Sequence, residues 1–167
     1  MKIEIAASAG FCFGVRRATK TLEDEIASGS RTVYTLGRLI HNDGYNRSLE
    51  ERGVRSISSD GLGDVIARAR SGEPTTVVVR AHGEDRRVLG ELEAAREECP
   101  DFRVLDCTCP YVDKVRRIAE ENSGPDSLFI LIGAAEHPEV RGIMSCTRGE
   151  GYVFRDEDEL SAFMDSP

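Results

Sequence analysis

The chain has 167 residues, of which 40% are hydrophobic and 31% charged, enough to bury a core in one or two compact lobes. Its net charge of −8 and the lack of a long basic run argue against duplex nucleic acid as a partner. A diphosphate is still compatible, because histidines and helix N-termini bind it locally. No apolar run approaches the roughly 18–20 residues of a membrane span, and no secretory pattern opens the chain. We therefore expect a cytoplasmic protein.

Strands and helices alternate along the first half of the sequence. Alternating or β-branched apolar residues predict strands at residues 2–7, 32–36, 54–57 and 75–80. Helical spacing of apolar residues predicts helices over 15–28, over 85–98, and from a cap at Asn42 or Asp43 to Leu49. Residues 56–64 are polar and contain glycine, so we interpret them as a connection.

The second half repeats this pattern. Strands are predicted at residues 103–106, 128–132 and 152–154, and helices at 111–122, from Pro138 onward, and at 157–163. The alternation predicts an α/β fold of successive lobes with parallel sheets. We place a boundary near residue 100, between a first lobe at residues 1–99 and a second at 100–167.

The residues able to carry chemistry share one position in this pattern. The chain has three histidines, and His41, His82 and His137 each follow the carboxyl end of a predicted strand. Cys12 and Cys109 do so as well. Parallel α/β sheets bind ligands at that edge. We therefore expect these five side chains to share one pocket.

The two cysteines suit a soft metal group. Cys109 stands at the mouth of a helix that Pro110 opens, where the helix dipole and backbone N–H groups favour the thiolate. Cys12 lies in the tight turn at residues 10–14, where a small buried thiol is the alternative interpretation. Thiolates from separate turns suit an iron–sulfur cluster. Zinc is the inorganic competitor, although the sequence has no Cys-x-x-Cys pair.

Histidines from separate turns suit an anionic substrate beside such a cluster. Taken alone, His41 also fits a structural histidine that is hydrogen-bonded in a loop. Glu139, two residues after His137, is placed to move a proton, and its alternative role is to complement the helix dipole. The remaining cysteines are expected to be structural or to lie in the core: Cys99, Cys107 and Cys146.

Five motifs together resemble one known family. They are Gly10-Phe-Cys-Phe-Gly-Val-Arg-Arg-Ala18, Gly37-Arg-Leu-Ile-His-Asn42, Val79-Arg-Ala-His-Gly83, Asp106-Cys-Thr-Cys-Pro-Tyr-Val-Asp-Lys114 and His137-Pro-Glu-Val-Arg-Gly142. In order and spacing they resemble the IspH/LytB family of 4-hydroxy-3-methylbut-2-enyl diphosphate reductases, which act in the methylerythritol phosphate route to isoprenoids. The resemblance covers essentially the whole chain.

The resemblance implies a trefoil of three α/β lobes around an iron–sulfur cluster, expected as 4Fe–4S, held by one cysteine from each lobe. It implies a two-electron reductive dehydroxylation of an allylic diphosphate to isopentenyl and dimethylallyl diphosphate, with electrons from a ferredoxin or flavodoxin. On matching positions the implied roles are cluster ligation by Cys12 and Cys109, substrate binding by His41, His82 and His137, and catalysis by His137 and Glu139.

The sequence stops about where a third lobe of this family is expected to begin, and the third cluster cysteine has no counterpart. The strand at residues 2–7, with Cys12, is expected to belong to that third lobe. We therefore expect two of the three lobes, active only if the remaining lobe is supplied. The chain is then either a fragment of a longer protein or a half that another chain completes. The alternatives are a cluster-free module that binds a phosphorylated ligand, and a chain that folds poorly alone and exposes apolar surface.

Overall fold

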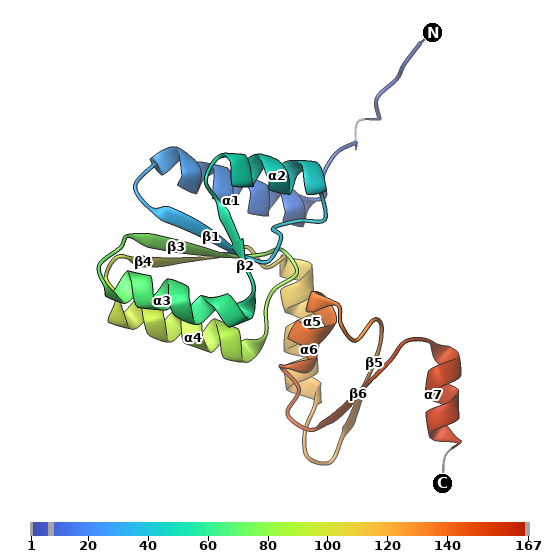
Figure 1. Ribbon diagram of the computed structural model, residues 1–167. Coiled ribbons are helices and arrows are strands. Elements are labelled where there is room, and N and C mark those ends of the chain that lie inside the picture. The colour runs from blue at the N-terminus through green and yellow to red at the C-terminus, as the bar shows by residue number, and fades with distance from the viewer. Residues whose placement is uncertain (1, 7–8, 166–167) are drawn as a thin grey trace.

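The computed structural model describes residues 2–6 and 9–165. Helices and strands alternate throughout (Figure 1). In chain order the elements are α1 (Phe13–Ser28), β1 (Thr32–Leu36), α2 (Asp43–Glu51), β2 (Arg55–Ile57), the 3-10 helix η1 (Ser59–Gly61), α3 (Leu62–Arg70), β3 (Thr75–Val79), α4 (Arg86–Glu98), β4 (Phe102–Asp106), α5 (Pro110–Asn122), β5 (Leu128–Ile132), α6 (Pro138–Met144), β6 (Glu150–Phe154) and α7 (Glu157–Met164).

The first sheet is a parallel sheet of four strands in the order β2-β1-β3-β4. Its centre is the pairing of β1 with β3, from Thr32 opposite Thr75 to Leu36 opposite Val79. The β-branched run of β3 is buried along its whole length, as expected for a parallel strand covered on both faces. The predicted α/β fold with parallel sheets is confirmed.

Helices cover both faces of this sheet, with α1 and α2 on one side and α3 and α4 on the other (Figure 1). Successive residues of β3 point to opposite faces. Val78 packs in a cluster with Leu22 and Leu49, whereas Val77 packs in a second cluster with Leu92. The core therefore lies on both sides of the sheet, and the carboxyl ends of the strands are left for the loops. None of the described helices is long and apolar enough to cross a membrane.

The second sheet consists of the parallel pair β5 and β6. The Phe163 ring of α7 packs against Tyr152 and Phe154 of β6, with ring centroids 4.9 and 5.2 Å away. The strand β5 is less covered, because its alternate residues are between 38% and 55% exposed: Leu128, Ile130 and Ile132. This sheet therefore leaves apolar surface open to solvent.

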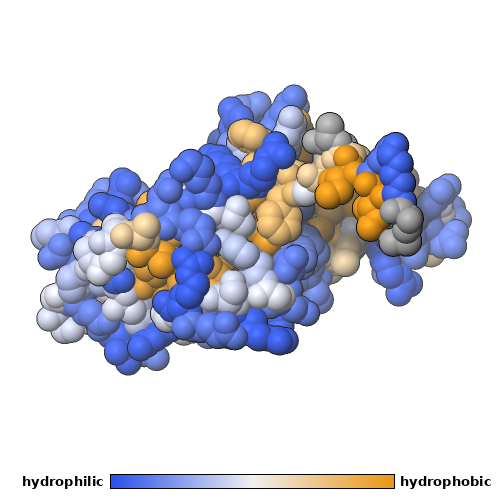
Figure 2. All heavy atoms as spheres, turned by 90° about the horizontal axis from the view of Figure 1, so that it is seen from above, coloured by the Kyte–Doolittle hydropathy of each residue, from blue (hydrophilic) through white to orange (hydrophobic). Residues whose placement is uncertain are grey.

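The strand predicted at residues 2–7 is not formed in the described part of that segment, residues 2–6, while Ala7 lies outside the described residues. Ile3 and Ile5 are 74% and 84% exposed. A strand needs a neighbouring strand for its backbone hydrogen bonds, and none lies beside residues 2–6 among the described residues. Figure 2 shows apolar side chains exposed, in orange, on the face from which this segment projects.

Helix α3 was not expected from the sequence, and the connection predicted at residues 56–64 overlaps its start. Its buried residues recur at helical spacing: Leu62, Val65, Ile66 and Ala69. The polar, glycine-containing stretch before them concealed the signal. The first sheet also extends past residue 100, since β4 pairs with β3. How the chain divides into domains stays a prediction.

Candidate functional site

Three histidine side chains meet at the carboxyl edge of the first sheet. His41 follows β1, His82 follows β3, and His137 precedes α6. The ring centroids of His41 and His82 lie 4.4 Å apart, and that of His137 lies 5.9 and 5.6 Å from them. Since β1 and β3 are neighbours, their loops are adjacent, and the loop after β5 brings the third ring. The convergence of the histidines predicted from the strand ends is confirmed.

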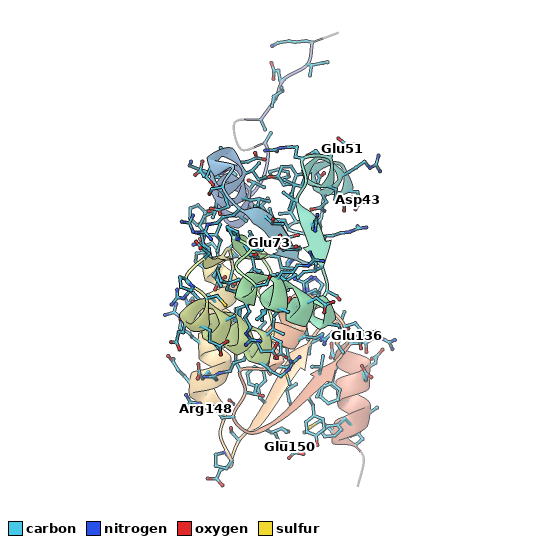
Figure 3. The ribbon with its side chains drawn as sticks, turned by 60° about the vertical axis from the view of Figure 1, so that its left-hand side comes forward. Asp43, Glu51, Glu73, Glu136, Arg148 and Glu150 are labelled. Carbon is cyan, nitrogen blue, oxygen red and sulfur yellow. The ribbon has the colours of Figure 1, made fainter. Side chains whose placement is uncertain are left out.

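The orientation of His137 is set by the helix that follows it. His137 is the N-cap of α6, and its Nδ1 accepts a hydrogen bond from the Glu139 backbone N–H at 3.3 Å. Because Nδ1 is an acceptor here, the neutral imidazole carries its proton on Nε2. Glu139 is partly buried in the first turn of α6. Glu136, just before His137, lies at the junction of the two sheets (Figure 3).

The turn that carries Cys109 lies directly beside the His82 loop. The Cys107 N–H donates to the Val79 carbonyl at 3.0 Å, and the Cys109 N–H donates to the Ala81 carbonyl at 2.9 Å. These bonds continue the pairing of β3 with β4 past the strand ends. Cys109 is the N-cap of α5, with a proline in the first turn, as the sequence predicted.

The start of α1 packs against the same cysteine. Cys12 is the exposed N-cap of α1, and Gly14 in its first turn is buried. A Cβ added to Gly14 would lie 2.6 Å from the Cys109 Sγ. The absence of a side chain at Gly14 therefore lets the helix approach the thiol. Sequence reasoning had assigned no role to Gly14, although its place two residues after a candidate ligand was the available signal.

The other cysteines are buried, as expected. Burial raises the pKa of the Cys107 thiol to about 11, so it stays protonated at neutral pH. The Cys146 Sγ lies 3.4 Å from the Gly142 carbonyl, and Cys99 is 5% exposed. Within residues 2–6 and 9–165, no three His, Cys, Asp or Glu side chains are placed to hold one metal ion. Cys12 and Cys109 are therefore at most part of a ligand set.

Among the three histidine rings, His82 has a strongly shifted pKa. Burial, with the neighbouring His41, His137 and Arg80, lowers its pKa from 6.5 to about 4. Loss of water disfavours the charged imidazolium, and the surrounding basic groups repel another positive charge. His82 is therefore neutral at pH 7, and an anion placed among the three rings would favour its protonation.

Arg80 was missed by sequence reasoning. Its Nη2 lies 3.0 Å from the Glu84 Oε2, and the two side chains are only 19% and 13% exposed. The pair borders a cavity of about 240 Å³, which is also lined by Gly37 after β1 and by Glu136 and Pro138 on either side of His137. A glutamate four residues after an arginine that ends an apolar strand was the only local signal.

Comparison with known proteins gives consistent matches. The family model described as LytB protein matches residues 3–166. The chain is 37% identical over 162 residues to 4-hydroxy-3-methylbut-2-enyl diphosphate reductase from Geotalea uraniireducens (strain Rf4). The aligned residues cover 96% of this chain and 52% of that relative. The protein of the same name from Campylobacter curvus (strain 525.92) is 36% identical over 161 residues, covering 96% and 52%. The chain thus spans about half the length of these relatives.

Solved structures give the same result. One described as (E)-4-hydroxy-3-methyl-but-2-enyl diphosphate reductase, the terminal enzyme of the non-mevalonate pathway, matches with a TM-score of 0.69 at 31% identity, covering 98% of this chain and 54% of that one. The E-1-hydroxy-2-methyl-but-2-enyl-4-diphosphate reductase from Plasmodium falciparum matches with a TM-score of 0.71 at 26% identity, covering 93% and 45%. The arrangement of elements described above is shared with both.

Proposed function

Because the chain belongs to the LytB protein family, we propose that it forms the N-terminal part of an iron–sulfur reductase acting on an allylic diphosphate. The reaction proposed is the reduction of 4-hydroxy-3-methylbut-2-enyl diphosphate to isopentenyl and dimethylallyl diphosphate. The observation that carries the proposal is the meeting of three imidazoles beside the Cys109 turn. Since the chain spans about half of its relatives, the activity is proposed for this part together with the remainder.

The imidazoles of His41, His82 and His137 are proposed to bind the diphosphate or the substrate hydroxyl. Each ring nitrogen that carries a proton donates to a phosphate oxygen, and a protonated ring adds a charge-assisted bond. The low pKa of His82 in the free chain reflects its burial first and the neighbouring basic groups second, and an anion would offset the repulsion from those groups. Diphosphate binding is therefore expected to take up protons near neutral pH.

Cys12 and Cys109 are proposed to ligate the cluster. Their fit rests on soft thiolate donors at the starts of α1 and α5, and on the space that Gly14 leaves beside the Cys109 Sγ. A bound cluster would supply the electrons of the reduction, received from a ferredoxin or flavodoxin. Two thiolates hold a cluster weakly, so a further ligand is expected from the remainder of the protein.

Glu139 and His137 are proposed to deliver protons. The reaction consumes two electrons and two protons: the allylic C–O bond breaks, the hydroxyl leaves as water, and a proton is added to the allylic carbon. His137 presents its Nε2–H as a donor, because Nδ1 is held by the Glu139 backbone. The carboxylate of Glu139 lies in the same helical turn and is suited to relay a proton to the site.

The second sheet supports a requirement for further polypeptide. In the first sheet β1 has a neighbour on each side, whereas within residues 2–6 and 9–165 β5 pairs with β6 alone. The face of β5 that points away from the core is open: Leu128, Ile130 and Ile132 are the exposed residues. A two-stranded sheet has little stability alone. We propose that further polypeptide, corresponding to the part of the relatives that this chain does not span, packs on this face and completes the site.

Anaerobic reconstitution with iron and sulfide tests this function against the alternative of a cluster-free phosphate-binding module. Iron and sulfide content and the visible absorbance of the cluster are measured for the wild-type chain and for a Cys12→Ser, Cys109→Ser double variant. Weak, labile incorporation that disappears in the double variant is expected. Pyrophosphate binding without any cysteine-dependent iron uptake would favour the alternative module instead.

A further inference from the structure

Arg17 connects the helix that follows Cys12 to the turn that carries Cys109. Arg17 lies in α1, and its guanidinium Nη2 donates hydrogen bonds to the carbonyls of Asp106 at 3.2 Å and Thr108 at 2.9 Å. Thr108 immediately precedes Cys109, and Asp106 lies three residues before it. One side chain thus bonds across about ninety residues to the segment that positions the thiol.

The carbonyls that Arg17 binds face the open edge of the first sheet. β4 is the edge strand of this sheet, and just past its end the inward N–H groups of Cys107 and Cys109 bond to the carbonyls of Val79 and Ala81. Alternate residues of a strand direct their backbone groups to the opposite side, so Asp106 and Thr108 face outward. The Asp106 Oδ1 accepts the outward Thr108 N–H at 2.8 Å. The turn is therefore held from both sides.

One face of α1 contacts this turn at successive helical positions. Gly14 packs against the Cys109 thiol, Arg17 bonds the two carbonyls, and the Ala18 carbonyl lies 4.0 Å from the Cys107 Sγ. Residues spaced by three and four share one helical face. Of these contacts, only those of Arg17 are directional and charge-assisted, and such bonds define geometry better than packing does.

We infer that Arg17 is a positioning residue, which holds the start of α1 against the Cys109 turn and so sets the separation of the Cys12 and Cys109 thiols. The inference rests on the proposed function in assuming that these two thiols act together. Arg17 is exposed to solvent, and water can replace it at both carbonyls. Its loss is therefore expected to loosen the placement of the thiols more than it destabilises the fold.

Bridging of the two thiols tests this inference without a cluster. The apo chain is treated with dibromobimane, a short reagent that joins two nearby thiols, and the Cys12–Cys109 bridge is quantified by peptide mass spectrometry. The variants are Arg17→Met, which keeps bulk but no donors, and Arg17→Lys, which keeps the charge. Arg16→Met is the matched control, because the structure describes no hydrogen bond or ion pair of the Arg16 side chain.

Arg17→Met is expected to slow bridging about tenfold, the change in population that corresponds to about 1.4 kcal/mol, with Arg17→Lys in between and Arg16→Met unchanged. Far-ultraviolet circular dichroism should stay the same for all three variants. Bridging of Arg17→Met at the wild-type rate would overturn the inference, and so would a wild-type chain that forms no bridge. Slower bridging in Arg17→Met would also overturn it if the slowing only accompanies unfolding and is not partly restored in Arg17→Lys. A wild-type chain that forms the bridge but takes up no iron and sulfide would refute the proposed function and leave the inference about Arg17 standing.

Discussion

Replacing Gly14 by alanine would place a methyl group 2.6 Å from the Cys109 Sγ and 3.1 Å from its Cβ. Contacts this short are not tolerated, so either the thiol or the start of α1 must move. Overpacking of this kind costs about 1–3 kcal/mol, and alanine returns at most about 1 kcal/mol through its better helix propensity. We expect a net loss of about 1–2 kcal/mol in the free energy of unfolding, or a melting temperature lower by about 2–8 °C.

Gly90→Ala provides the matched control, because Gly90 lies within α4 and no atom comes within 4 Å of an added Cβ. There only the propensity gain applies, so a stabilisation of about 0.5–1 kcal/mol is expected. Urea unfolding followed by circular dichroism measures both variants. Repeating Gly14→Ala in a Cys109→Ala background removes the sulfur atom and should recover most of the loss. If Gly14→Ala stabilises the chain as Gly90→Ala does, with no effect of the background, the packing of α1 on Cys109 is refuted.

Three further predictions concern buried or clustered polar groups. The folded-state pKa of His82, about 4, lies below the ordinary 6.5, so the unfolded chain binds the proton more readily. The free energy of unfolding should therefore fall by about 1–2 kcal/mol as the pH drops from 6.5 to 4. In a His82→Asn variant the urea midpoint should depend less on pH, and an unchanged pH dependence would contradict the assignment. Glu25, 6% exposed, pairs with Arg103 at 2.9 Å, so Glu25→Gln should cost about 1–3 kcal/mol in urea unfolding, and a neutral result would show that the pair adds nothing. At pH 7 iodoacetamide should label Cys107, whose pKa is about 11, far more slowly than the exposed Cys12, as peptide mapping would measure; equal rates would place Cys107 at the surface.

Local patterns predicted the elements that build the first sheet. The β-branched run at residues 75–79 forms a fully buried strand, and the caps expected at Asn42 and Cys109 begin α2 and α5. These features depend on neighbouring residues along the chain, so the sequence alone contains them. The segment at residues 2–6 differs, because strand formation needs a partner that no local pattern supplies.

For the candidate site, the sequence was informative about position but not about contact. The placement of His41, His82 and His137 at strand ends predicted one pocket, because parallel strands direct their carboxyl ends to one edge. The depressed pKa of His82 was not predictable, since it depends on burial and on rings that lie far away in the sequence. The spacing of Arg80 and Glu84 was a local signal for their pairing, but the burial of the pair beside the three histidines depends on the tertiary structure.

By itself the sequence determined the alternation of strands and helices, the family, and the five residues expected to meet at one edge. The tertiary structure decided which surfaces touch: it brought Gly14 against the Cys109 thiol and Arg17 onto the carbonyls beside it. The physical reason is that hydrophobic periodicity records which face of an element is buried. The partner of that face depends on strand order and helix packing, which join residues about ninety positions apart and are encoded by no local pattern.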